Sequence, residues 1–322
     1  MLSRAEGTRA EVLDAESAPA GAGVLAGSPP RSRERRDLPV RVVSPEVHLG
    51  HRIAEIWRYR QLLLAMVKKE FKVKYRNSAL GFAWSMLNPA ATIAIFYVVF
   101  QLILGSGIPN FAIFLMSGMV VYNLFQYAAG QATPTVVNNS QLVKKVAFPR
   151  EILALASVGT AIVFFACQAV VLVGFLVAFR YAPDYSYLPD LIPAFLALVL
   201  FVSALAIFLA AVNVYMRDIQ HLMEIVVGTA WFWATPIVYS YNLIEGKLAP
   251  HGLGWILLVN PLTDVVLVFQ RAIYHQSLVL PAGADHWWYL WHVLAVIGGS
   301  IVLFVIAMVI FARLESNFAE EL

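Results

Sequence analysis

The chain has 322 residues, of which 60% are hydrophobic and 13% are charged, and its formal net charge is +3. A soluble domain carries about a quarter charged residues, so this composition excludes an ordinary soluble domain and indicates an integral membrane protein. The single cysteine, Cys167, excludes an internal disulfide, and no spacing of metal ligands occurs.

Residues 1–50 differ in composition from the rest of the chain. They are rich in Ala, Gly, Ser, Pro and charge, and they contain no Phe, Tyr or Trp. Such a segment cannot bury enough apolar surface to fold alone, and it lacks the apolar stretch of a signal peptide. The sequence therefore predicts a disordered cytoplasmic tail.

The next segment, residues 51–78, reads HRIAEIWRYRQLLLAMVKKEFKVKYRNS. Apolar residues at near-helical spacing alternate here with Lys and Arg. This pattern predicts one amphipathic helix that lies in the cytoplasmic interface of the membrane. A cytoplasmic helix packed on protein is the alternative.

Residues 79–322 are predicted to form an all-α membrane domain with six spans, since a helix needs about 20 apolar residues to cross the hydrocarbon. The predicted spans are 81–104, 111–131, 152–179, 191–215, 219–239 and 287–311. Residues 242–286 contain an apolar stretch that Asn260 and Pro261 interrupt. We expect two re-entrant helices at the outer face there, with a seventh span as the alternative.

Lys and Arg residues precede the first predicted span and follow the second and fourth spans, whereas the opposite loops contain few. Positive charge near the ends of spans marks the cytoplasmic side. The sequence therefore predicts that both termini are cytoplasmic, which agrees with an even number of spans.

No phosphate-binding loop, zinc-protease motif, nucleophile elbow or Cys/His cluster occurs in the chain. The predicted spans also contain almost no ionisable residues, apart from Glu224. Ion-coupled carriers usually keep such residues at membrane depth, so their scarcity argues against secondary transport. A multispan protein with neither such residues nor a nucleotide site must take its energy from a partner, or use none.

The short basic segment 138–150 separates the second and third predicted spans. It is amphipathic, as expected for a helix that seats its apolar side in a partner and fixes its register with charges. Pro149 is expected to begin the next helix. An ordinary positively charged loop is the alternative. The candidate coupling residues are Gln141, Val143, Lys144, Lys145, Phe148 and Arg150.

Four aromatic residues, Trp231, Trp233, Tyr97 and Tyr122, are candidates for the wall of a glycan path, because aromatic faces stack on sugar rings. The alternatives are anchoring at the membrane interface and simple packing, and packing is favoured for the two tyrosines.

Five further residues are candidates for a gate. Pro89 and Pro236 are expected to kink the first and fifth spans, since proline removes a backbone hydrogen bond. Glu224 is expected to pair with a basic residue such as Lys72 or Arg76. Asn260 and Pro261 fit the tip of the re-entrant hairpin.

Five pieces resemble, in order, those of type-2 ABC exporter permeases for lipid-linked polysaccharides of the O-antigen and teichoic-acid class. They are KVKYRNSALGFAWSMLNPA (72–90), LVKKVAFPREIL (142–153), NVYMRDIQHLMEIV (213–226), TPIVYS (235–240) and VNPLT (259–263). The resemblance covers residue 53 to the C-terminus. The sequences of these five pieces are similar to those of mycobacterial galactan exporters.

The resemblance implies a homodimeric permease of the bacterial plasma membrane, paired with two separate ATPase subunits that bind ATP and Mg²⁺. The substrate would be an undecaprenyl-diphosphate-linked polysaccharide, with galactan favoured. Segment 138–150 would be the coupling helix, and the first and fifth spans would form a lateral gate. The chain itself would be neither an enzyme nor a cofactor-binding protein, and no nucleic-acid partner is expected.

Three other functions fit parts of the pattern. A drug or small-lipid exporter permease would share the architecture. A membrane-embedded glycosyltransferase would need acidic residues near a metal-diphosphate site, and none cluster on one face here. A membrane scaffold that transports nothing would leave the ATP turnover of its partner unchanged when Lys144, Lys145 and Arg150 are replaced.

Overall fold

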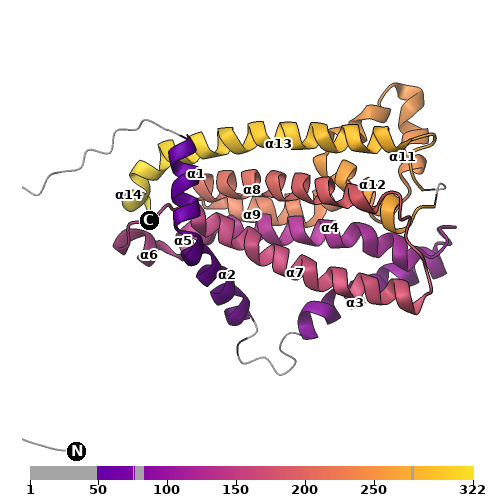
Figure 1. Ribbon diagram of the computed structural model, residues 1–322, viewed down its shortest axis with the longest axis horizontal. Helices are drawn as coiled ribbons and strands as arrows, with labels where there is room; N and C mark the ends of the chain where they lie inside the picture. Colours follow the sequence, from indigo (N-terminus) through magenta and orange to yellow (C-terminus); the bar gives the residue numbers. More distant parts are fainter. Residues whose placement is uncertain (1–48, 75, 77–82, 277–278) are drawn as a thin grey trace, which may run out of the picture. The chain divides into compact units, whose positions relative to one another are not determined.

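The structure is a computed structural model. It describes residues 49–74, 76, 83–276 and 279–322. All regular structure within these ranges is helical, as predicted for an all-α integral membrane protein (Figure 1). The predicted tail, residues 1–50, lies outside the described residues except for its last two positions.

Among the residues that the structure describes, four helices are long and apolar enough to cross a membrane. Helix α8 packs against the other three, and α4 also packs on α7. The four coincide with the second, third, fourth and sixth predicted spans. They are α4 (Phe111–Ala132), α7 (Glu151–Ala178), α8 (Leu191–Tyr215), which follows the 3-10 turn η2 (Leu188–Asp190), and α13 (His286–Leu314).

The first and fifth predicted spans are helices of mixed type. Helix α3 (Ala83–Phe96) continues into the π-helix η1 (Tyr97–Ile103). Helix α9 (Asp218–Ile225) continues into the π-helix η3 (Val226–Ala230) and then α10 (Trp231–Trp233). The fifth predicted span therefore ends at Trp233, six residues before its predicted end at residue 239. Neither meets the length and hydropathy of a span, so the described residues contain four candidate spans, and six spans stay a prediction.

The predicted amphipathic helix is two helices, α1 (Leu49–Arg58) and α2 (Arg60–Lys74), so the prediction of a single helix is wrong. Helix α2 packs along α7. Phe71 stacks on Phe164 with ring centroids 5.6 Å apart, and the Thr160 hydroxyl donates to the Glu70 carboxylate at 3.0 Å. Helix α2 is therefore packed on protein, which is the alternative that the sequence left open.

Between α4 and α7 the chain forms two short helices, α5 (Thr135–Asn138) and α6 (Ser140–Lys145). Val146 is extended, and α7 begins at Glu151 rather than at Pro149. The predicted coupling segment is thus a short helix followed by an extended stretch, and not one continuous rod.

The segment before α13 contains α11 (Tyr241–Leu248), two 3-10 segments, η4 (Ala249–His251) and η5 (Gly254–Val259), and α12 (Pro261–Ile273). Helix α12 is almost wholly buried against α4 and α8. Asn260 caps α12 and Pro261 is its first residue, so the two residues begin a helix, and their place at the tip of a re-entrant hairpin stays a prediction.

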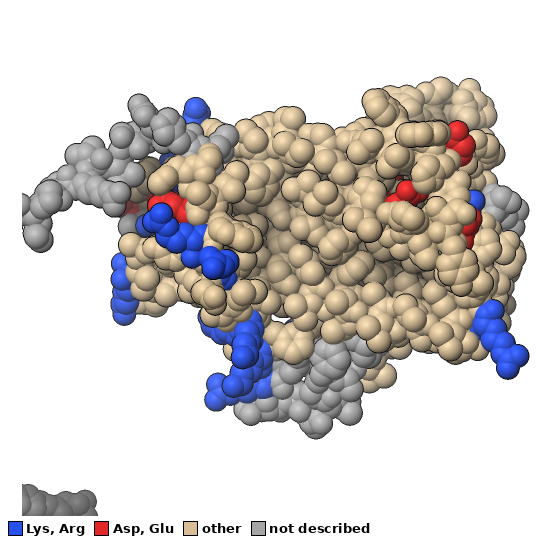
Figure 2. Space-filling model, viewed as in Figure 1, with Lys and Arg blue, Asp and Glu red and all other residues tan. Residues whose placement is uncertain are grey.

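The chain ends in η6 (Glu315–Asn317) and α14 (Phe318–Glu321), which lie near α1 and α6 (Figure 1). We call the end of the molecule that carries α1, α6 and α14 the basic end. On the face in Figure 2, most Lys and Arg side chains gather over this end and α2, and a broad band without charged residues separates it from the opposite end.

An ion-pair cluster joins three separate segments at the basic end. Arg52 of α1 binds Glu151, which is only 1% exposed, and its second guanidinium nitrogen lies 3.0 Å from the Glu315 carboxylate. Arg150 donates to the Glu315 backbone carbonyl at 2.7 Å. The cluster therefore fixes α1 and the start of α7 to the C-terminal turns.

Close packing of α2 on α7 depends on the absence of a side chain at Gly159. A β-carbon there would lie 2.7 Å from Cγ2 of Val67, whose branched side chain has little rotamer freedom. We predict that Gly159→Ala destabilises the purified protein by about 1–3 kcal/mol, because α2 must move.

Thermal unfolding in detergent measures this loss. Gly174→Ala is the control, because it lies on the same helix and has no atom within 4 Å of the added carbon. The double variant with Val67→Ala should recover most of the loss. Equal stability of Gly159→Ala and Gly174→Ala would contradict the close contact.

Candidate functional site

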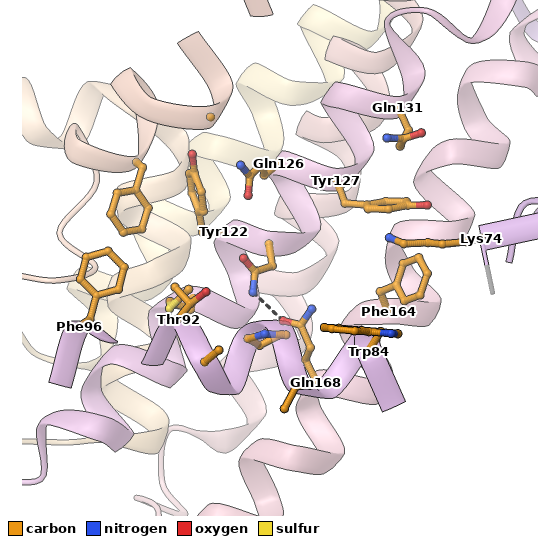
Figure 3. A pocket seen from close by; sticks show the side chains of 17 residues that line it. Lys74, Trp84, Thr92, Phe96, Tyr122, Gln126, Tyr127, Gln131, Phe164 and Gln168 are labelled. Carbon is orange, nitrogen blue, oxygen red and sulfur yellow. Dashed lines mark hydrogen bonds between the residues drawn. The ribbon is translucent and has the colours of Figure 1, made fainter. Parts of the chain in front are cut away.

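A cavity with a volume of ≈ 1070 Å³ lies between α3, α4, α7 and η3, with the last residue of α2 at its rim (Figure 3). Trp84 and Leu87 at its edge are 50% and 47% exposed, so the cavity opens to the surface along α3. None of its 17 lining residues is acidic. We call this cavity the main groove.

Amide side chains from two helices form one wall of the main groove. Asn123, Gln126 and Gln131 of α4 all line the groove, and they lie on one broad side of the helix because Gln126 and Gln131 follow Asn123 by three and eight positions. The Asn123 amide donates to the Gln168 side-chain carbonyl of α7 at 2.8 Å (Figure 3). This wall offers both donors and acceptors to a neutral, hydroxyl-rich ligand.

Aromatic rings form the other surfaces of the main groove. Phe96 of α3 stacks on Phe232 of the fifth predicted span with centroids 5.6 Å apart. At the other end the Lys74 ammonium lies 4.2 Å and 4.3 Å from the ring centroids of Tyr127 and Phe164. Burial against these rings lowers the pKa of Lys74. The groove thus combines aromatic faces, amides and one cation.

Tyr122 lines the groove, but its hydroxyl is used within the fold. The side chain is 2% exposed, and the hydroxyl donates to the backbone carbonyl of Val227 in η3. A π-helix disturbs the regular pairing of helix carbonyls, and this bond supplies a partner for one of them. The packing interpretation of Tyr122 is therefore supported, although its ring still faces the groove.

The other three predicted path aromatics lie outside the main groove. Trp231 packs on Phe125 with centroids 4.9 Å apart and donates its indole N–H to Asn260 at 2.8 Å. Trp233 is 50% exposed and does not line the groove. Tyr97 lines a second, smaller cavity.

The predicted gate residues divide into different environments. Pro89 lies inside α3 and lines the main groove, and its role in a gate stays a prediction. Pro236 does not kink a helix, because the fifth predicted span has already ended at Trp233. Glu224 lies 3.7 Å from His221 on its own helix, so the expected pairing with Lys72 or Arg76 is wrong.

Asn260 connects the end of the fifth predicted span to α12. Its side-chain carbonyl accepts from Trp231 and from the Leu262 backbone N–H at 3.1 Å, and its amide donates to the Thr235 hydroxyl at 2.9 Å. A nearby bond from the Gln270 amide to the Pro236 carbonyl, 2.9 Å long, joins the same two segments. The non-helical stretch 234–240 is thereby held on α12.

Some of the predicted coupling residues are buried or paired within this chain, and the others are exposed. Val143 and Phe148 are 3% and 8% exposed and pack into this chain, so their predicted seating in a partner is wrong for this conformation. Arg150 is held by Glu315. The exposed residues of the segment are Asn138, Gln141, Lys144, Lys145, Val146 and Ala147.

Sequence reasoning missed the amide wall and Lys74. A signal was present, because Asn123, Gln126 and Gln131 are polar residues at helical spacing within an apolar span, and such residues usually face a cavity. Lys74 had no comparable signal, since it is one of many basic residues in its segment. In the described part of the chain no group of three His, Cys, Asp or Glu residues could hold a metal ion.

Comparison with known proteins gives consistent matches. The sequence profile of the family described as "ABC-2 type transporter" matches residues 61–274. The chain is similar to an "O-antigen export system permease protein RfbA" of Klebsiella pneumoniae, at 29% identity over 80% of this chain and 94% of that protein. It is also similar to the protein of the same name from Myxococcus xanthus, at 29% identity over 84% of this chain and 98% of that protein.

The role of Asn260 as a connector can be tested by substitution. We predict that Asn260→Ala lowers the free energy of unfolding by roughly 2 kcal/mol, because it removes a helix cap and two side-chain bonds. Thermal unfolding of the purified protein measures the loss. Asn260→Ser keeps a capping oxygen and should lose less. Equal losses in the two variants would show that the cap contributes nothing.

Proposed function

Because the chain belongs to the ABC-2 type transporter family, we propose that it is the membrane subunit of an exporter for a lipid-linked polysaccharide. In this family a separate subunit hydrolyses ATP, so the chain is a permease and not an enzyme. On this proposal the substrate moves from the cytoplasmic to the outer face of the bacterial plasma membrane.

The main groove is the observation that carries the substrate proposal. A glycan presents hydroxyl groups and apolar ring faces, and the groove presents amides and aromatic rings without any carboxylate among its lining residues. Neutral contacts of this kind hold each sugar weakly enough to let a chain slide. Two similar proteins are named as O-antigen export permeases, which supports the same class of substrate.

The finer parts of the proposal rest on the motif resemblance. The carrier lipid is undecaprenyl diphosphate, and galactan is the favoured glycan. Two copies of the chain form the transport path together with two ATPase subunits, which bind ATP and Mg²⁺. Both termini face the cytoplasm, and the basic end carries the surface for the ATPase. No nucleic acid takes part.

The amide wall leads to a specific prediction about transport. Gln126→Leu removes a hydrogen-bonding group from the groove, and one such bond contributes on the order of 1 kcal/mol, so the transport rate should fall about fivefold. The measurement is transfer of undecaprenyl-linked glycan in vesicles that contain the permease and its ATPase. Gln126→Asn keeps an amide and should retain most of the rate.

The same vesicles separate the proposal from its rivals. A drug or small-lipid exporter would move a fluorescent dye or phospholipid and leave the glycan, and Gln126→Leu would then have no effect on glycan. A glycosyltransferase would extend the glycan without ATP. A scaffold would transport nothing and would leave ATP turnover unchanged.

The exposed face of the coupling segment leads to a second prediction. Val146 is 49% exposed beside Lys144 and Lys145, so it is available to seat in a partner. We predict that Val146→Asp leaves the fold stable but uncouples ATP hydrolysis from glycan transfer. Both rates are measured in the vesicles described above.

Val143→Asp is the contrasting variant, because it places a charge in a buried site and should destabilise the protein itself. If a well-folded Val146→Asp protein still coupled ATP hydrolysis to glycan transfer, the segment would be an ordinary loop and not a coupling element.

A further inference from the structure

A second cavity, with a volume of ≈ 510 Å³, lies at the end opposite the basic end. Helix α3 with η1 forms one side, and the start of α4 and the last turns of α7 form the other. Its floor is apolar, with Phe111 and Ile113 buried beneath it. None of the described residues that line it is charged. We call it the second groove.

The length of the second groove corresponds to one leaflet of a bilayer. Its lining runs along the first predicted span from Ala90 to Gln101, which is 101 − 90 = 11 residue steps. At a rise of about 1.5 Å per residue this is about 16 Å. The hydrocarbon of one leaflet is about 15 Å deep, which is half of a core of about 30 Å.

The polar groups of the second groove lie toward one end. Gln101 lines it and accepts from the Ser106 hydroxyl at 2.8 Å, and Asn110 lines it at the start of α4. Arg180 follows directly after Phe179, another lining residue, and has no carboxylate partner among the described residues. An apolar slot with amides toward one end, and with the exposed Arg180 next in sequence to the lining residue Phe179, fits a phosphate head group joined to a hydrocarbon chain.

The second groove also opens where a lipid would enter it. Tyr97, Val98 and Phe179 on its two sides are 38%, 45% and 58% exposed. Small residues on α3, Ala90 and Ala94, leave room between them. In a membrane protein such an exposed apolar face meets the hydrocarbon chains directly.

We propose that the second groove binds a phospholipid of the bilayer, with one acyl chain between α3 and α7 and the phosphate at Arg180. A void of ≈ 10 Å³ lies between the second groove and the main groove, and Pro89, Ala90 and Gln168 line it. The bound acyl chain therefore packs against α3 on the side away from the main groove, and α3 is one wall of that groove. The lipid site does not depend on which substrate is transported.

The test uses the full chain in vesicles of phosphatidylglycerol that contain a trace of the same lipid with a photoactivatable diazirine on one acyl chain. After irradiation, mass spectrometry maps the labelled peptides. Labelling is expected on the part of α3 and η1 around Ala94 and on the last turns of α7. Ala94→Trp fills the groove and should abolish this labelling.

Ile95→Trp is the matched control, because Ile95 is 63% exposed on the same helix and lines none of the three cavities. Labelling should persist there. Arg180→Gln removes the cation and should weaken labelling about fivefold. Because Arg180 is exposed, this variant keeps the test decisive even if Ala94→Trp fails to fold.

Two results would overturn the proposal. One is equal labelling of Ala94→Trp and wild type, or of Arg180→Gln and wild type, which would mean contact with bulk lipid only. The other is displacement of the phospholipid label by undecaprenyl phosphate at a small fraction of the phospholipid, which would assign the groove to the carrier lipid.

Discussion

Inside the hydrocarbon every backbone N–H and C=O group must find its partner within the protein, because no water is available there. The long helices meet this demand through their own hydrogen bonds. Where the chain departs from the α-helix, side chains supply the partners. Tyr122 reaches the Val227 carbonyl of η3, and Gln270 reaches the Pro236 carbonyl beyond α10. The irregular fifth predicted span therefore depends on α4 and α12, and the main groove lies beside it.

At the basic end the charges serve the fold as well as the surface. Arg52, Glu151 and Glu315 join α1, the start of α7 and the end of the chain, and Arg150 joins the same cluster directly after the segment that we expect to contact an ATPase. A force applied to that segment acts on α1 and the C-terminal turns together. The exposed side chains of that segment, among them the two lysines and Val146, form a surface separate from this internal ion-pair cluster.

Hydropathy predicted the four long spans well, because each is a single apolar helix of sufficient length. It placed the end of the fifth span too far along the chain, since apolar composition continues through Pro236 after the helix has ended at Trp233. The family-level resemblance is confirmed by the match over residues 61–274. The burial of Val143 and Phe148 was not predictable from amphipathicity, because the pattern identifies an apolar face but not what covers it. The tertiary contact between Asn123 and Gln168, 45 positions apart, also has no local signal.

The size of the main groove limits what the subunit can sense. A cavity of ≈ 1070 Å³ is at the upper end of the sites that hold a single small molecule, which run to about 1,000 Å³. On the proposed function, only a few sugars of a long glycan touch this wall at any moment, and each advance replaces them with chemically equivalent ones. On this proposal the groove wall meets the repeating unit at every step, and its contacts are the same for a short polymer and a long one.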